Sequence, residues 1–291
     1  MKPQVTIKII EDISEMHQAM ELQRQVWQEH DSEIIPAHLM NSAVHSGGLL
    51  IGAFVDQQMV GLLFGFPGVY STPDGPRLKH YSSILGVRSE FQSQGIGFAL
   101  KRAQWQMVRH QGIDRITWTF DPLLSRNAWL NITRLGAVCS TYLRDFYGKM
   151  QDSLNAGLPT DRFDVDWWVN SQRVYRRLSR RRRNALSLNH FLAGGAALIN
   201  PLELGLQDPP GSVDLAGIKL GKEQPFLLVE IPSDFQALKS QDMQLAVSWR
   251  MQTRLIFEKL FAAGYIVTDF ARSTIEPLRS FYVLCHGEST L

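Results

Sequence analysis

The chain has 291 residues, of which 44% are hydrophobic and 20% are charged, and its formal net charge at pH 7 is +2. This composition is typical of a globular protein, and the length suffices for one large domain or two average ones. The two cysteines, Cys139 and Cys285, are too few for a disulfide framework or a cysteine-based zinc site.

The sequence also indicates where the protein works. It contains no unbroken run of about 18 apolar residues, which a membrane-spanning helix needs. Its first segment, MKPQVTIKIIEDISEM, carries acidic residues early and lacks the apolar core and cleavage site of a signal peptide. We therefore expect a cytoplasmic protein that has no membrane partner, holds no metal and keeps both thiols buried.

Hydrophobic spacing predicts a mixed α/β layer structure in the first 170 residues. Alternating apolar residues indicate strands, and apolar residues that recur every three or four positions indicate helices. In chain order the expected elements are a strand at 4–10, a helix from Ser14, a helix after Pro36, strands at 49–55, 59–70 and 78–87, a helix from Gly97 to Gly112, a strand at 115–120, a helix at 125–135, and strands at 137–148 and 162–169.

The pattern after residue 170 is weaker. Residues 171–224 combine a basic stretch with a segment rich in glycine and proline, and we interpret them as a linker. Residues 225–291 form an expected C-terminal subdomain with a strand, a long helix at 238–263 and two further strands. Because "LGAVCSTYL" resembles "AAGYIVTDF", this subdomain is either a degenerate half-repeat or a chance similarity.

Seven arginines lie between Arg173 and Arg183 in a stretch without acidic residues; subtracted from the net charge of +2, they leave −5 for the rest of the chain. Such a cluster can bind phosphate backbones, as in a nucleic-acid-associated protein. At helical spacing, however, the arginines would surround the helix and form no stripe. We therefore favour a solvated helix or linker paired with acidic residues, and we do not expect nucleic acid as the partner.

A pair of glycines separates an expected strand from an expected helix. The stretch Gln92-Ser93-Gln94-Gly95-Ile96-Gly97 follows the strand that ends near Val87. The first N–H groups of a helix lack internal partners and lie at the positive end of its dipole, and glycine lets an anion approach them. The stretch therefore predicts a phosphate-binding cradle. It is no P-loop, because the lysine and Ser/Thr of that motif are absent, and Gly86 lies too far from Gly95 for a dinucleotide fingerprint.

The same stretch resembles the acetyl-coenzyme A motif of the GNAT acyltransferases, [Gln/Arg]-x-x-Gly-x-[Gly/Ala], with Gln92, Gly95 and Gly97 at its three defined positions. The order of elements over 4–169 also resembles that family. The resemblance implies a GNAT-like domain at 1–170 with a mixed, mostly antiparallel sheet flanked by helices. It further implies acetyl-coenzyme A as the cofactor and acyl transfer to an amine of a small molecule or peptide.

The resemblance also implies which residues bind coenzyme A. They are Leu85, Val87, Gln92, Ser93, Gln94, Gly95, Ile96, Gly97, Asn127 and Asn131. Leu85 to Val87 would hydrogen-bond the pantetheine arm through backbone atoms, and the amides of Asn127 and Asn131 could contact cofactor or substrate.

The tyrosine that many family members use in catalysis is missing. Counting back from Gly136 places Ile132 at its position. The candidate catalytic residues are therefore His80, before the motif, and Tyr142, in the strand after the helix. A hydrogen-bonded histidine and a packed tyrosine are the structural alternatives.

Polar residues beside aromatic ones suggest a substrate pocket at the start of the last strand of the GNAT-like domain. Asp161, Arg162 and Trp167 are the expected substrate-binding residues, and a capped turn entering a buried strand explains them equally well. Two alternatives to an enzyme remain open. One is a non-catalytic acyl-coenzyme A sensor on the same fold, and the other is a nucleic-acid-associated protein that uses Arg173 to Arg183. A homo-oligomer is compatible with the sequence.

Overall fold

The computed structural model describes residues 4–27, 34–150, 152, 155–179, 186–200, 220–221, 224–273 and 278–287. The chain divides into two compact units. Unit 1 comprises Met1–Trp118 and Trp168–Asn170, and unit 2 comprises Thr119–Trp167 and Ser171–Leu291. Each unit has its own cluster of buried apolar side chains.

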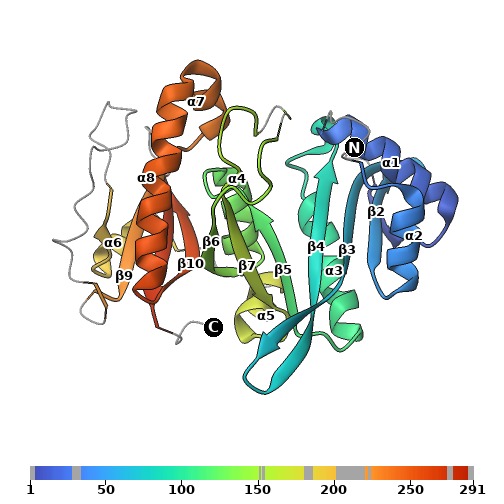
Figure 1. The fold of residues 1–291 in the computed structure, drawn as a ribbon, viewed down its shortest axis with the longest axis horizontal. Coiled ribbons are helices and arrows are strands. Elements are labelled where there is room, and N and C mark those ends of the chain that lie inside the picture. The colour runs from blue at the N-terminus through green and yellow to red at the C-terminus, as the bar shows by residue number, and fades with distance from the viewer. Residues whose placement is uncertain are drawn as a thin grey trace. The chain divides into compact units, whose positions relative to one another are not determined.

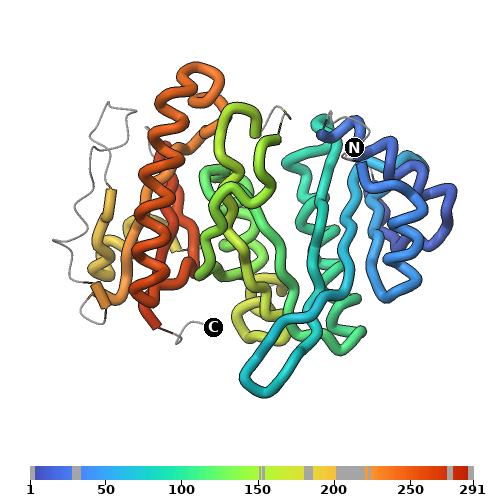
Figure 2. The backbone as a smooth tube through the Cα atoms, in the orientation of Figure 1, coloured from blue at the N-terminus to red at the C-terminus, as the bar shows by residue number. Residues whose placement is uncertain are grey.

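Unit 1 is built on antiparallel strands. In sheet order they are β1 (Thr6–Ile9), β2 (Leu49–Val55), β3 (Gln58–Thr72), β4 (Gly75–Val87) and, parallel to β4, the first part of β5 (Arg115–Phe120). β3 and β4 form a long hairpin, whose two strands run side by side in Figure 1 and Figure 2. The β2–β3 turn uses Asp56 and Gln57 with φ of 45° and 65°, which are the left-handed values of a tight hairpin turn.

Helices cover the sheet of unit 1. They are α1 (Ile13–Trp27), α2 (Ala37–His45) and α3 (Ile96–His110), with a short η2 (Ser89–Phe91) before α3. Buried Met16 and Met40 bring α1 and α2 into one apolar cluster with Leu62 of β3. Gly61 lets α3 approach β3 closely, because a Cβ there would lie 3.1 Å from Ile96 Cγ2.

Unit 2 contains a second run of strands. In sheet order they are β7 (Arg162–Trp168), β6 (Val138–Leu143), β10 (Tyr265–Arg272), β11 (Ser280–His286), β9 (Phe226–Ile231) and β8 (Ala197–Leu198). Its helices are α4 (Ser125–Ala128), η3 (Trp129–Arg134), α5 (Gln172–Leu178), α6 (Leu188–Ala193), α7 (Phe235–Gln241) and α8 (Met243–Ala262). The mixed, mostly antiparallel sheet flanked by helices that the sequence predicts is thus confirmed.

Aromatic rings join the two halves of unit 2. The ring of Phe163 on β7 lies 4.7 Å from that of Phe257 on α8 and 5.2 Å from that of Tyr282 on β11, centroid to centroid. Residues of the predicted C-terminal subdomain therefore share a core with residues of the predicted GNAT-like domain. The two compact units have other bounds, and the domain boundaries expected at 170 and 224 stay a prediction.

β6 and β10 are the central pair of the four strands β7-β6-β10-β11. β6 and β10 pair antiparallel at Cys139↔Val267, with β7 beside β6 and β11 beside β10. Gly136 precedes Cys139 by the same three residues by which Gly264 precedes Val267.

Several predicted elements differ in detail. The long helix expected at 238–263 is two helices, because Asp242 has extended backbone and caps α8 by accepting from the Leu245 N–H. α6 and β8 lie where a linker is expected. Within the predicted basic stretch, Arg173 donates to backbone carbonyls and Arg177 pairs with Asp269 at 2.6 Å. Residues 180–183 and 201–219 lie outside the described residues.

Candidate functional site

The loop between β4 and α3 is held by its own side chains. The amide of Gln92 donates to the carbonyl of Val87 at 3.0 Å, and the amide of Gln94 donates to the carbonyl of Glu90 at 3.1 Å. Ser93 adopts a left-handed backbone with φ of 61°. These contacts turn the chain from β4 into α3 while residues 92–95 stay exposed.

Gly95 is the N-cap of α3 and leaves the helix terminus open. Its φ is 87°, and no side chain caps the first turn. A Cβ at this position would meet no atom within 4 Å. The first N–H groups of a helix lack intrahelical acceptors and carry the positive end of the dipole, so an uncapped helix N-terminus is a place where proteins can bind an anionic group.

β4 separates from its neighbour before it reaches the loop. In the described part of the chain, the β4–β5 register covers only the pairs made by His80 and Tyr81, whereas the pairing with β3 continues to Val87. One edge of Leu85–Val87 therefore has no register with a second strand. Such an edge can hydrogen-bond an extended ligand.

β4 also contains a bulge that the sequence did not reveal. The register with β3 shifts between Phe64 and Gly65, which places an extra residue, Ser83, in β4. Bulges re-aim backbone groups and are frequent beside active sites.

His80 lies fully buried within β4, which begins at Gly75, before the start expected at residue 78. Neither ring nitrogen has a hydrogen-bond partner among the described residues. Burial, with a smaller effect from the charge of Lys101, lowers the pKa of His80 to about 4, so the imidazole is neutral at neutral pH. Gly65 makes room for the ring, because a Cβ at 65 would lie 2.4 Å from His80 Nε2.

Lys101 on α3 is a buried cation that the sequence motifs did not indicate. Its Nζ donates to Ser82 Oγ at 2.9 Å and to Gln104 Oε1 at 3.3 Å, and it lies 3.6 Å from the ring centroid of Trp118. Burial lowers the pKa of Lys101 well below its usual value. The sequence feature that could have indicated its burial is the position of Lys101 next to Leu100, at the apolar face of α3.

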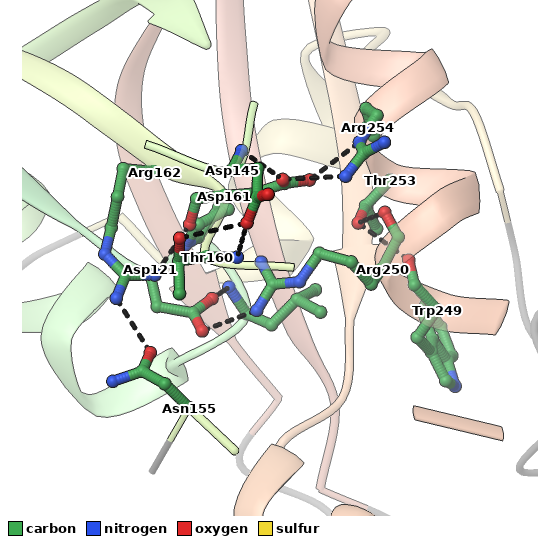
Figure 3. A network of polar contacts seen from close by, with 12 residues as sticks. Asp121, Asp145, Asn155, Thr160, Asp161, Arg162, Trp249, Arg250, Thr253 and Arg254 are labelled. Carbon is green, nitrogen blue, oxygen red and sulfur yellow. Dashed lines mark hydrogen bonds and ion pairs between the residues drawn. The ribbon is translucent and has the colours of Figure 1, made fainter. Parts of the chain in front are cut away.

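Asp161 organises a polar network in unit 2, shown in Figure 3. Its carboxylate accepts two hydrogen bonds from Arg254 of α8, at 2.8 and 2.7 Å, and one from the Tyr142 hydroxyl at 2.8 Å. The backbone N–H of Asp145 donates to it at 3.0 Å. Burial raises the pKa of Asp161, but these hydrogen bonds outweigh burial, so its pKa is lowered and the group is ionised.

The hydroxyl of Tyr142 thus donates its hydrogen bond to the carboxylate of Asp161. Its ring is largely buried, with the ring of Phe163 at 5.8 Å edge-on and that of Phe257 at 6.3 Å stacked. Burial raises the pKa of Tyr142, and the nearby Asp161 carboxylate raises it further. The phenol therefore stays protonated over the physiological pH range.

Arg162 is brought next to Asp161 and towards Asn155, as Figure 3 shows. Its Nη2 donates to Asn155 Oδ1 at 2.7 Å, and its Nη1 donates to the carbonyl of Asp161 at 2.9 Å. The guanidinium lies 5.2 Å from the ring centroid of Tyr147. The predicted pair Asp161 and Arg162 thus forms one polar site.

Trp167 lies in the core of unit 2. Its side chain is fully buried, and its Nε1 donates to the carbonyl of Leu135 at 2.8 Å. Its role in substrate binding stays a prediction.

A second ion pair of unit 2 was not predicted. Asp121, which follows β5, accepts from Arg250 Nη2 at 2.5 Å and from the Leu123 N–H at 2.8 Å. Arg250 is 1% exposed, and its Nε and Nη1 have no partner among the described residues. Arg250 and Arg254 are four residues apart and so share one face of α8, and this spacing is the sequence signal that indicates them.

The described residues contain no set of three or more His, Cys, Asp and Glu side chains arranged to hold a metal ion. Likewise, none of the described helices is both long enough and apolar enough to span a membrane.

No model of a known protein family and no curated protein matches the chain. Solved structures do match part of it. The ribosomal-protein-S18-alanine N-acetyltransferase from Escherichia coli is 13% identical with a TM-score of 0.44, over 58% of this chain and 96% of that one. A GNAT-family acetyltransferase from Streptococcus pneumoniae is 11% identical with a TM-score of 0.44, over 56% and 98%.

A third match, a GNAT-family acetyltransferase from Elizabethkingia anophelis with acetyl-CoA bound, is 14% identical with a TM-score of 0.40, over 56% and 97%. These are partial likenesses, so the fold assignment rests on the element order from β1 to β7 and on the glycine-started α3 after β4. The chain has a GNAT-like fold.

The helix that follows β5 in this GNAT-like fold departs from regular geometry. α4 continues into the π-helical η3, so residue spacing there differs from that of an α-helix. Asn127 is exposed on α4, whereas Asn131 and Ile132 are buried in η3. A buried isoleucine thus stands at the position counted for the tyrosine of the GNAT-like pattern.

Proposed function

We propose that the chain is an acyl-coenzyme A-dependent acyltransferase, in its simplest form an N-acetyltransferase that acetylates an amine. The observation that carries the proposal is the open, uncapped N-terminus of α3 at Gly95. It follows a strand whose register with β5 ends at Tyr81. A cytoplasmic location stays a prediction.

The residues present fit coenzyme A. The backbone N–H groups of Gly95, Ile96 and Gly97 start α3, where the negative pyrophosphate would be stabilised. The unpaired edge of Leu85–Val87 suits the amides of the pantetheine arm, as a strand edge suits an extended peptide. When bound, coenzyme A supplies the thioester that carries the acyl group.

One residue is proposed to accept the proton and a second to position Asp161. The attacking amine must be a free base and must lose a proton as the amide forms. His80 is the proposed acceptor, because its imidazole is neutral and both ring nitrogens lack partners among the described residues. Tyr142 is proposed to stay protonated and to hold Asp161 in place.

The proposed acceptor is the amine of a small molecule or a peptide. Asp161 and Arg162 are the proposed substrate-binding residues, since Asn155, Tyr142 and Arg254 hold them in fixed positions. Asn127 and Asn131 stay candidates for cofactor contact.

A non-catalytic acyl-coenzyme A sensor is the second candidate function. It is favoured by buried Ile132, which leaves η3 without a phenol to protonate a departing thiolate. The nucleic-acid alternative is not proposed, because Arg173 and Arg177 are bonded to groups of unit 2 itself.

A thiol-release assay separates enzyme from sensor. Acetyl-coenzyme A is incubated with the protein and a panel of polyamines, amino acids and peptides, and free thiol is followed with a chromogenic disulfide. If the protein is an enzyme, the wild type should release thiol only when an amine is present. His80→Gln should lower the rate of thiol release at least about tenfold, a rough size for one proton-transfer group. The exposed His45→Gln variant is the control and should keep the wild-type rate. If acetyl-coenzyme A binds tightly but no amine of the panel causes thiol release, the result would favour the sensor.

A further inference from the structure

One residue of β4 has register with neither neighbouring strand. The register with β3 passes from Ser82 directly to Ile84, so Ser83 between them has no partner on that side. On the other side, the register with β5 reaches only Tyr81 in the part of the chain that the structure describes. Ser83 therefore lies where β4 has left β5 and is out of step with β3.

Side-chain contacts show the same interruption of β4. Ser82 faces α3, because its Oγ accepts a hydrogen bond from Lys101. Gly86 faces α1, because a Cβ there would lie 2.6 Å from Cη2 of Trp27. α1 and α3 cover opposite faces of the sheet, as the neighbouring β3 residues that contact them show. Positions four apart share a face in a regular strand, so the extra residue Ser83 reverses the facing of the segment after it.

The two adjacent serines differ in what their hydroxyls contact. Ser82 is buried and holds Lys101 at 2.9 Å. Ser83 is partly exposed, and its hydroxyl has no hydrogen-bond partner among the described residues. The hydroxyl of Ser83 is therefore available to a ligand that lies along this edge of β4.

Ser83 lies between the parts of β4 to which the proposed function gives a role. Leu85–Val87, the proposed edge for the pantetheine arm, begins two residues after it, and His80 lies three residues before it. At about 3.3 Å per residue, Val87 is about 13 Å from Ser83 along the strand. The pantetheine arm ends in the sulfur of coenzyme A. An arm that leaves the cradle at Gly95 and follows Leu85–Val87 therefore carries its sulfur towards Ser83.

We propose that the hydroxyl of Ser83 donates a hydrogen bond to the sulfur of coenzyme A. Acyl transfer leaves the electron pair of the broken C–S bond on this sulfur, and a hydrogen bond to a charged acceptor is roughly twice as strong as one between neutral groups. No bond of Ser83 forms or breaks, and its proton stays on the oxygen. Ser83 thus supplies the donor that buried Ile132 cannot supply. The inference rests on the proposed function in that coenzyme A binds along β4.

The ionisation of bound coenzyme A tests the hydrogen bond without any acceptor amine. The full chain is saturated with coenzyme A, and the ultraviolet absorbance of the thiolate is followed as the pH is raised. The same titration with desulfo-coenzyme A, which lacks the sulfur, is subtracted to remove the protein's own titration. A donor to the thiolate lowers the pKa of the bound thiol, so Ser83→Ala should raise that pKa by about one pH unit or more relative to the wild type.

Two further variants separate the hydroxyl from the fold. Ser83→Thr keeps a hydroxyl at the bulge and should keep the wild-type pKa of the bound thiol. Ser71→Ala removes an exposed hydroxyl elsewhere in the β3–β4 hairpin and should also leave that pKa unchanged. A serine with only a structural role would change the melting temperature of the free protein and leave the pKa of the bound thiol as it is. With an acceptor amine, Ser83→Ala should lower the rate of thiol release by about tenfold or more.

The outcomes distinguish this proposal from the proposed function. If coenzyme A raises the melting temperature of the wild type and Ser83→Ala leaves the pKa of the bound thiol unchanged, the hydrogen bond is refuted and the proposed function stands. If the pKa rises in Ser83→Ala while no amine accepts an acyl group, the hydrogen bond stands and the sensor is favoured. If neither coenzyme A nor acetyl-coenzyme A changes the melting temperature of the wild type, both proposals are overturned.

Discussion

His80 shows what burial does to a single side chain in unit 1. The imidazole is enclosed between β3 and α3, where Gly65 leaves it room, and its ring nitrogens meet no partner among the described residues. Its pKa falls from 6.5 to about 4, chiefly because burial penalises the charged form. Between these two values the unfolded chain binds a proton at His80 that the folded chain does not bind.

His80 should therefore make the fold acid-sensitive. The free energy of unfolding has its full value above pH 6.5 and falls as the pH drops towards 4, by about 2 kcal/mol between pH 6.5 and 5. Urea denaturation at a series of pH values should show this loss in the wild type and a flatter profile in His80→Gln. Exposed His45→Gln is the control. A wild-type slope retained in His80→Gln would contradict the assignment.

At the scale of elements, α8 presents one charged stripe. Arg250, Arg254 and Glu258 are spaced by four residues and so share a face of the helix. They pair with Asp121, Asp161 and Arg144 in turn, and the pairs become more exposed along the helix. α8 thus fixes the segments at the ends of β5, β6 and β7.

Because the ion pairs of this stripe differ in exposure, variants that break them should lower the free energy of unfolding by different amounts. Arg254→Met leaves the Asp161 carboxylate buried without its cation and should lower the free energy of unfolding by about 3–5 kcal/mol. Arg144→Met breaks a pair whose arginine is largely exposed and should lower the free energy of unfolding far less than Arg254→Met does. The double variant Asp161→Asn/Arg254→Met should recover part of the first loss. Equal losses from Arg144→Met and Arg254→Met in urea denaturation would refute this ranking.

The elements themselves were largely predictable, because apolar periodicity fixes which face of a strand or helix is buried. β2 to β5 and α3 follow that pattern, and the glycine pair marked the start of α3. The same periodicity applies to β7. There Phe163, Val165 and Trp167 alternate with acidic residues, which indicates that these three residues share the buried face. This alternation predicts the burial of Trp167 that the structure shows.

The polar contacts of the candidate site were less predictable. Arg250 meets Asp121 across 129 residues and Arg254 meets Asp161 across 93, and no local pattern encodes such partners. The bulge at Ser83 depends on the register with β3, which is likewise a property of two strands. Local sequence therefore predicted the glycine-started helix α3, while most of the buried charged network emerged only with tertiary structure.

At the scale of the whole molecule, the strands of unit 2 bear on the possible half-repeat in the sequence. In the strand order β7-β6-β10-β11, the central strands β6 and β10 pair at Cys139↔Val267, and each has one further strand on its outer side. A glycine lies three residues before each of these two residues, Gly136 before Cys139 and Gly264 before Val267. This arrangement supports the half-repeat that "LGAVCSTYL" and "AAGYIVTDF" indicate, and the half-repeat stays our proposal.

Acetyl-coenzyme A binding tests the central claim for the whole chain, because a ligand that binds the folded state alone raises its melting temperature. Gly95→Glu puts a negative side chain into the cradle. Gly112→Glu is the matched control, since both glycines have positive φ, of 87° and 75°, and open surroundings. At millimolar acetyl-coenzyme A the wild type and Gly112→Glu should gain melting temperature, and Gly95→Glu should not. No gain in the wild type, or an undiminished gain in Gly95→Glu, would contradict the cradle.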